Sequence, residues 1–130
     1  MKDIDEFLEK YTVILSSDGI ISDVEAHRRA TMFLEACAHL ISYKHQLLDE
    51  EIKSSSLSDI NFAEALNKQE GGDAKKREVN AKADLVYIQA KETFEQNRNR
   101  TRTIDKFYDV FMNAHIFYRK LSSDLESRNV

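Results

Sequence analysis

Four basic side chains lie in or next to a segment of the sequence that has no apolar residue. The segment covers residues 95–103 and contains Arg98, Arg100 and Arg102, and Lys106 follows just beyond it. Arg98 and Arg102 are four residues apart, so a helix places them on one face, and Lys106 continues that face. Arginine presents a planar fork of N–H donors that matches a phosphate group. This arginine row is therefore a candidate contact for a nucleic-acid backbone.

Two other interpretations of the arginine row stay open. In the first, the row is an ordinary solvated face whose charges pair with carboxylates, and the nearest of these are Glu78, Glu92 and Glu95. In the second, the row binds an acidic protein partner. The surroundings of the guanidinium groups distinguish these cases. Exposed arginines without acidic partners favour phosphate contact, whereas arginines that each meet a carboxylate favour an assembly role.

A second basic group stands at the expected start of a helix. Lys75, Lys76 and Arg77 follow Asp73 closely, and Lys82 lies further along the same segment. The positive end of the helix dipole disfavours cations in the first turn, where selection for stability alone would place acidic residues. We take this arrangement as a sign of a binding role. The predicted nucleic-acid-binding set therefore includes these four residues together with the arginine row and Lys106.

The other reactive residue types form no recognisable catalytic or metal-binding set. No two of the four histidines are four residues apart, whereas zinc usually takes three or four ligands, preferably His or Cys. Cys37 lies on an apolar stripe, where a thiol is buried and inert. No glycine-rich phosphate loop is present, and no strand–turn context supports a Ser–His–Asp set. We expect a protein that is not an enzyme and that binds no metal and no cofactor.

Composition favours helices, and the charge is unevenly distributed. The chain has no proline and only three glycines, and 32% of its residues are charged, which is typical of long exposed helices. Residues 1–70 carry 14 acidic and 7 basic side chains, a net charge of −7, and residues 71–130 carry 9 and 12, a net charge of +3. The chain as a whole is not a general nucleic-acid binder. Its second half can nevertheless present a local basic strip.

The sequence favours a cytoplasmic protein. A single cysteine cannot form an internal disulfide, as is usual in a reducing compartment. The first residues are acidic and contain no apolar stretch of the kind that a signal peptide needs. No window approaches 18 apolar residues, so we expect no membrane span.

Apolar spacing and helix signals predict a single helical domain over residues 1–130. Ser22 and Glu25 have the spacing of a capping box, Asp18 and Gly19 indicate a turn, and Asp73 can cap a later helix. The expected parts are an N-terminal helix and turn at 1–21, a first long helix at 22–53, a short helix with a Gly71–Gly72 hinge at 54–73, and a second long helix at 74–126.

Each long helix carries one apolar stripe, which the other helix can cover. In the first long helix two series repeat every seven residues, as in a coiled coil: Phe33, Leu40, Leu47 and Leu34, Ile41, Leu48. The predicted fold is all-α, a long helical hairpin with two short accessory helices. We expect residues 95–103 to continue the helix. The alternative is a turn near Arg98, which would give a compact four-helix bundle.

The lengths of the two expected long helices predict self-association. The apolar spacing predicts a second helix that is about 20 residues longer than the first. Its surplus stripe then lacks a partner within the chain, and exposed apolar patches usually mark interfaces. A symmetric homo-oligomer covers such a stripe most simply. The predicted interface consists of Phe111, Ala114, Tyr118, Leu121 and Leu125.

Several features follow one another in a fixed order along the chain. An acidic N-terminal stretch precedes the helix around residues 25–30, a loop with Gly71 and Gly72 follows, and a long helix then contains Ala83 and Asp84 and ends in the aromatic-rich segment 107–118. Over most of the chain this layout resembles the UvsY-type recombination mediators of tailed phages. The resemblance implies a small, helical, ring-forming cytosolic protein that binds single-stranded DNA and helps to load a recombinase.

These observations support two hypotheses about function. The first is a non-enzymatic accessory protein that binds single-stranded DNA and a recombinase, or another protein, in recombination or replication. The second is a protein–protein interaction or assembly module that binds no nucleic acid. Both are compatible with a homo-oligomer, so the surroundings of the arginine row are the feature that discriminates between them.

Overall fold

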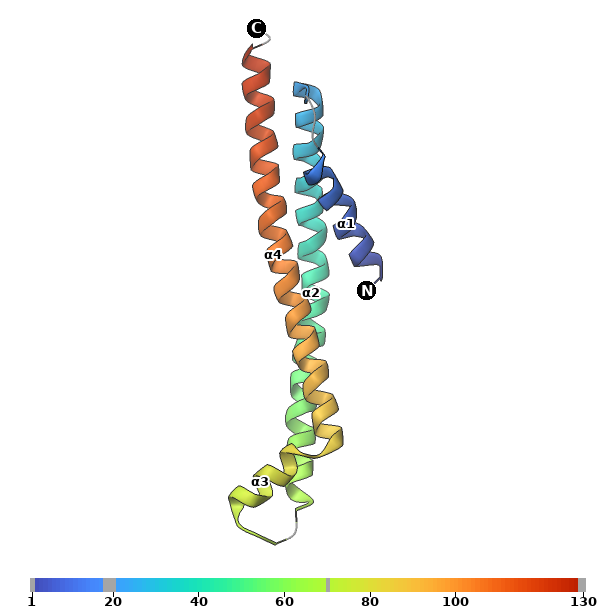
Figure 1. The fold of residues 1–130 in the computed structure, drawn as a ribbon, viewed down its shortest axis with the longest axis vertical. Helices are drawn as coiled ribbons and strands as arrows, with labels where there is room; N and C mark the ends of the chain where they lie inside the picture. Colours follow the sequence, from blue (N-terminus) through green and yellow to red (C-terminus); the bar gives the residue numbers. More distant parts are fainter. Residues whose placement is uncertain (1, 18–20, 70, 129–130) are drawn as a thin grey trace. The chain divides into compact units, whose positions relative to one another are not determined.

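The computed structural model describes residues 2–17, 21–69 and 71–128, and every regular element in these ranges is an α-helix. The helices are α1 (Lys2–Ser16), α2 (Asp23–Asn67), α3 (Ala74–Lys82) and α4 (Leu85–Arg128). The long helices α2 and α4 pack as a hairpin, with α1 and α3 as short additions (Figure 1). The predicted all-α hairpin with two short accessory helices is confirmed.

The chain divides into two compact units. The terminal unit comprises Met1–Tyr43 and Ile104–Val130, and the central unit comprises Lys44–Thr103. The terminal unit therefore contains α1, the first part of α2 and the later part of α4. The central unit contains the rest of α2, the whole of α3 and the first part of α4. Each unit has its own packing and is described by itself.

An aromatic cluster forms the core of the terminal unit. Phe33 of α2 and Phe111 of α4 are fully buried, with ring centroids 5.6 Å apart. Tyr11 of α1 lies 5.6 Å from Phe33 and 5.5 Å from Phe111. Tyr118 stacks on Phe33 with the centroids 5.8 Å apart. Tilted and offset ring pairs at these distances add to the stability that burial alone provides. Three helices thus share one core in this unit.

Only one of the two predicted seven-residue series on α2 is buried. Leu40 and Leu47 are 1% and 2% exposed, and with Phe33 they form the buried stripe. The second series lies one position further round the helix, and there Leu34 and Ile41 remain 47% and 45% exposed. The core shared with α1 and α4 covers the side of α2 that carries Phe33 and Leu40, and Leu34 and Ile41 lie outside it. The second series therefore leaves an apolar strip on the surface.

The helix α2 continues past residue 53, where the sequence prediction ended it. Ser54, the first of three consecutive serines, is buried, and its hydroxyl donates to the main-chain oxygens of Glu50 at 2.8 Å and Glu51 at 3.0 Å. Serine is unfavourable in a helix interior because its hydroxyl competes for the hydrogen bonds of main-chain groups. Here that hydroxyl makes its hydrogen bonds within the helix itself. The three serines therefore lie inside α2, which ends only at Asn67.

The second long helix begins at Leu85 rather than at residue 74, because the chain breaks between α3 and α4. The side chain of Asp84 accepts hydrogen bonds from the main-chain amides of Val86 at 3.0 Å and Tyr87 at 3.2 Å. These contacts are those of a helix N-cap, which satisfies amides that have no partner within the helix. Asp84 therefore starts α4, and the preceding residues form α3 as a separate helix.

The predicted cap and hinge before α3 agree with the structure. The side chain of Asp73 accepts a hydrogen bond from the main-chain amide of Lys76 at 2.8 Å. Gly71 and Gly72 have φ values of 76° and 80°, which glycine adopts without the steric penalty of a side chain. The other predicted turn, at Asp18 and Gly19, lies outside the residues that the structure describes.

Residues 95–103 continue α4 without a break, so the predicted continuous helix is confirmed. In the central unit this stretch packs through polar side chains, since Asn97 and Thr101 are each 7% exposed. The amide nitrogen of Asn97 donates to the hydroxyl of Ser54 at 3.1 Å, and Thr101 donates to a carboxylate oxygen of Glu51 at 3.2 Å. The gap in the apolar stripe is therefore a hydrogen-bonded polar layer.

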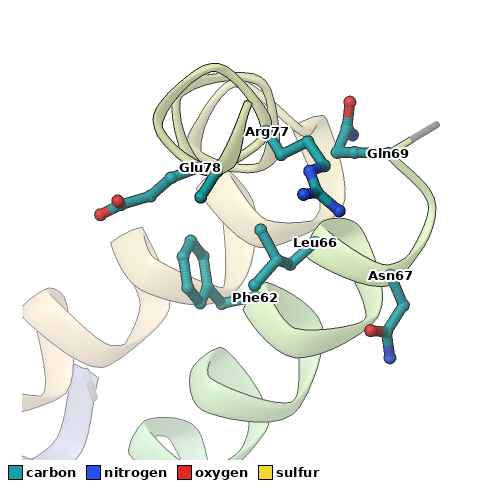
Figure 2. Close-up of a pocket in the computed structure, with 7 residues that line it drawn as sticks. Phe62, Leu66, Asn67, Gln69, Arg77 and Glu78 are labelled. Carbon is teal, nitrogen blue, oxygen red and sulfur yellow. The ribbon is translucent and has the colours of Figure 1, made fainter. Parts of the chain in front are cut away.

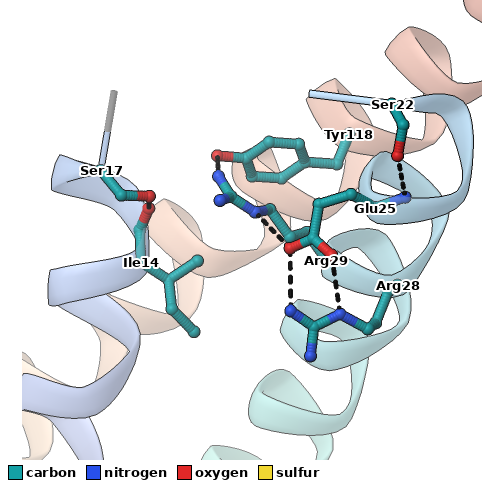
Figure 3. Close-up of polar contacts among 7 residues, drawn as sticks. All are labelled: Ile14, Ser17, Ser22, Glu25, Arg28, Arg29 and Tyr118. Atoms are coloured by element: carbon teal, nitrogen blue, oxygen red, sulfur yellow. Dashed lines mark hydrogen bonds and ion pairs between the residues drawn. The ribbon is translucent and has the colours of Figure 1, made fainter. Parts of the chain in front are cut away.

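The start of α2 carries a network of polar contacts (Figure 3). The hydroxyl of Ser22 accepts from the main-chain amide of Glu25 at 3.1 Å, which is half of the predicted capping box. The Glu25 carboxylate is bonded to Arg28 at 2.8 Å and to Arg29 at 3.1 Å. Hydrogen bonds from these two guanidinium groups lower the pKa of Glu25 from its ordinary value of 4.5 to about 2.

The lowered pKa of Glu25 predicts a pH dependence of stability. A carboxylate whose pKa is depressed by folding stabilises the protein above its unfolded pKa, and this contribution is lost as the pH falls through the folded pKa. We expect the Glu25 contribution to be lost between about pH 4.5 and pH 2, and Glu25→Gln to lack it. Urea denaturation followed by circular dichroism at several pH values measures this difference. Glu64→Gln, at an exposed position on the same helix, is the control, and an unchanged profile in Glu25→Gln contradicts the prediction.

Candidate nucleic-acid interface

Two members of the arginine row share an exposed face of α4. Arg98 and Arg102 are exposed, and each directly follows a residue that is buried toward α2, Asn97 or Thr101. Among the described side chains, no carboxylate lies within ion-pair distance of either guanidinium group. Their spacing of four residues places them on successive turns. The two guanidinium groups therefore form a cationic surface on the central unit that no carboxylate of the described residues neutralises.

The structure does not place all four predicted members of the row together. Arg100 is half-buried and lies on another side of α4, since two residues along a helix correspond to about 200° of rotation. Lys106 is exposed but belongs to the terminal unit. Within the central unit, Arg98 and Arg102 are thus the two arginines that present a common face.

The basic group on α3 is also exposed. Lys75, Lys76 and Arg77 lie in the first turn of α3, and in the described part of the chain none of them forms an ion pair. Lys82, at the other end of the helix, pairs with Glu78 at 3.1 Å. The first turn therefore combines three unneutralised cations with the positive end of the helix dipole.

A pocket lies beside this basic turn, and sequence reasoning did not predict it. Its volume is about 520 Å³, and it opens between the end of α2 and α3 (Figure 2). Phe62, half-buried, supplies aromatic surface, and its ring lies 5.1 Å from that of Tyr87. The pocket depends on α3 being a separate helix, and the signal that could have revealed this was the N-cap at Asp84. The lining residues are Phe62, Leu66, Asn67, Gln69, Ala74, Arg77 and Glu78.

The predicted oligomer interface packs largely within the chain. Phe111, Ala114 and Tyr118 are buried at 0%, 7% and 6% exposure, and Leu121 and Leu125 are half-buried. The surplus stripe from which this interface was inferred is not present, because α2 and α4 have nearly equal lengths of 45 and 44 residues. Contact of Leu121 and Leu125 with a second copy stays a prediction.

Tyr118 and Arg29 connect α4 to α2 in the terminal unit (Figure 3). The Arg29 guanidinium donates to the Tyr118 hydroxyl at 3.2 Å and lies 5.5 Å from the ring centroid. The hydrogen bond to Tyr118 raises the pKa of Arg29, and the cation also interacts favourably with the face of the ring. This arginine is therefore part of the fold and is not available to a ligand.

Cys37 and His115 are held inside the terminal unit. Cys37 is 1% exposed, its sulfur lies 3.8 Å from the main-chain oxygen of Tyr108, and burial raises the pKa of the thiol. A raised pKa disfavours the thiolate, which is the reactive form. His115 lies with Nδ1 2.8 Å from the main-chain oxygen of Ala30. Both side chains connect helices of the core.

Neither a candidate membrane span nor a candidate metal site is present in the described part of the chain. Across the described ranges, no helix has the length and apolar character that a membrane span requires. The same ranges contain no group of three or more His, Cys, Asp or Glu side chains arranged to hold a metal ion. No protein-family model, no curated protein and no solved structure matches the chain.

Proposed function

We propose that this protein is a non-enzymatic accessory protein that binds the backbone of single-stranded DNA. The observation that carries the proposal is the unpaired, exposed face formed by Arg98 and Arg102 on α4. An arginine row that served only helix stability would be expected to pair with nearby carboxylates. Guanidinium groups left open to solvent on successive turns suit the phosphates of a strand that runs along the helix.

Charge distribution supports a local and modest interaction. The central unit has 11 basic and 11 acidic residues, whereas the terminal unit has 8 and 12, a net charge of −4. Binding therefore depends on the local arrangement of cations and not on the total charge. Lys75 and Lys76 on α3 extend the cationic surface of the central unit. We expect micromolar affinity at low salt and a strong decrease as salt rises.

The cellular setting follows from the layout of the chain. The layout resembles UvsY-type recombination mediators, so we propose a role beside a recombinase in recombination or replication, as a homo-oligomer. A single cysteine suits a reducing, cytoplasmic compartment.

A salt titration of labelled single-stranded DNA tests this proposal. Each neutralised phosphate releases condensed counterions, so log K falls with log salt by about 0.7 per contact. Replacing Arg98, Arg100 and Arg102 together by alanine should weaken binding at low salt. It should also reduce the slope of log K against log salt by the amount that corresponds to about two to three phosphate contacts. Fluorescence anisotropy at several salt concentrations measures both quantities.

The matched control removes basic residues from the same helix outside the arginine row. Arg119→Ala with Lys120→Ala changes two exposed cations of α4 in the terminal unit. We expect this variant to keep the wild-type slope. Equal binding by the wild type and the triple variant would overturn the proposed site, and failure of the wild type to bind at low salt would overturn the proposed function.

The second candidate is a protein-interaction or assembly module without nucleic-acid binding. The observation that favours it is the number of large apolar side chains left on the surface. Leu34 and Ile41 are exposed in the terminal unit, and Leu57 and Ile60 are 53% and 54% exposed in the central unit. Exposed apolar groups that gather on one face mark interaction surfaces. If the DNA titration shows no binding, this candidate replaces the first.

A further inference from the structure

We propose that the pocket between α2 and α3 receives one base of the bound strand, with the adjoining phosphate on Arg77. This inference rests on the proposed function, because it adds a base-binding position to a surface that otherwise contacts only the backbone. The pocket lies wholly within the central unit, as do Arg98 and Arg102.

The apolar side of the pocket suits the flat face of a base. Phe62 and Leu66 line it, and Figure 2 shows both side chains directed toward α3. Leu66 is 37% exposed, so the apolar surface is open to solvent. Bases of single strands stack on aromatic side chains next to cations. The volume of about 520 Å³ lies within the range of roughly 300–1,000 Å³ that is common for small-ligand sites.

The charge of the pocket suits a phosphate. Arg77 lines it, and in the described chain no carboxylate is within ion-pair distance of its guanidinium group. Glu78, the acidic neighbour, is paired with Lys82 at 3.1 Å. Arg77 also lies in the first turn of α3, where the helix dipole adds positive potential. An apolar ligand without an anionic group would leave the Arg77 guanidinium without a counter-charge.

Gln69 adds a polar side chain to the rim of the pocket. Its amide nitrogen donates to the main-chain oxygen of Ala65 at 3.1 Å, so its side-chain oxygen remains an acceptor. An exocyclic amine on a base is a suitable donor to that oxygen. The pocket thus combines aromatic surface, a cation and an acceptor, which together suit a nucleotide with an amino-bearing base.

Comparison of a base-containing strand with an abasic strand tests the inference. The probes are a short labelled oligodeoxycytidylate and an abasic strand of the same length and charge, titrated in low salt with the full chain. We expect the abasic strand to bind about fivefold more weakly, a ratio that corresponds to about 1 kcal/mol, the lower end for stacking one base. Phe62→Leu should bring this ratio close to one, whereas Arg77→Gln should weaken both strands, because each strand contains the phosphate that Arg77 binds.

Lys76→Gln is the matched control, because Lys76 neighbours Arg77 on α3 without lining the pocket. It should weaken both strands equally and keep the ratio. Circular dichroism verifies that Phe62→Leu is folded, and Leu66→Ser, at a 37% exposed position that also lines the pocket, decides the test if it is not. Equal binding of the two strands to the wild type, or a ratio that persists when the apolar wall at Phe62 or Leu66 is replaced, overturns the base pocket and leaves the proposed function standing. Absence of binding to either strand overturns both.

Discussion

Phe111→Ala should lower the free energy of unfolding by about 3–5 kcal/mol, the usual range for truncating a fully buried phenylalanine. Its ring is 0% exposed and lies 5.5–5.8 Å from those of Tyr11, Phe33 and Phe107. Removing it leaves a cavity that α1, α2 and α4 all line, so no single helix can move to fill it. Urea denaturation followed by far-UV circular dichroism measures the change.

Phe117 provides a control of the same residue type on the same helix. It is 60% exposed, and its ring contacts that of Tyr118 at 5.2 Å. We expect Phe117→Ala to change the free energy of unfolding by less than about 1 kcal/mol, as surface substitutions usually do. Similar losses in the two variants would show that Phe111 is not at the centre of the core.

Asn97→Ala is expected to lower the free energy of unfolding by about 1–3 kcal/mol, because it removes a hydrogen bond between buried groups. The Asn97 amide donates to the Ser54 hydroxyl at 3.1 Å, and both residues are buried. Asn99→Ala, two residues away and exposed, should have little effect. Thermal and urea denaturation of the two variants provides the comparison.

A double variant separates the hydrogen bond from simple packing. When both polar partners are replaced by apolar groups of suitable size, the change can be nearly neutral or stabilising. Asn97→Leu combined with Ser54→Ala should therefore recover most of the stability that Asn97→Ala loses. A double variant less stable than Asn97→Ala would mean that the polar layer contributes through more than this pair.

Strong periodic signals in the sequence were sufficient to predict the fold. Two seven-residue series marked the apolar side of α2, although only Phe33, Leu40 and Leu47 proved to be buried throughout. The absence of proline together with the spacing on α4 indicated a long second helix. Asp73 with Gly71 and Gly72 correctly indicated a cap and a hinge. These signals are local, since each depends on residues within one or two helical turns.

Helix boundaries and the pocket depended on contacts that are distant in sequence. Ser54 appeared to be part of a break, but its position opposite Asn97 makes it an interior residue of α2. The cap at Asp84 was not distinguished from a surface aspartate, so α3 and α4 were predicted as one helix. The pocket between α2 and α3 could not be predicted without that boundary. Exposure of the arginine row also required knowledge of which neighbours lie close in space.

The pairing of Asn97 with Ser54 has a consequence for how α4 can be aligned along α2 in the central unit. A purely apolar seam tolerates sliding by one heptad, because similar side chains then replace one another. Moving α4 by seven residues toward the start of α2 would bring Asn97 to the level of Leu47, whose side chain offers the buried amide no acceptor. That state is disfavoured by the desolvation of the amide, so one polar contact opposes this shift of the helix register.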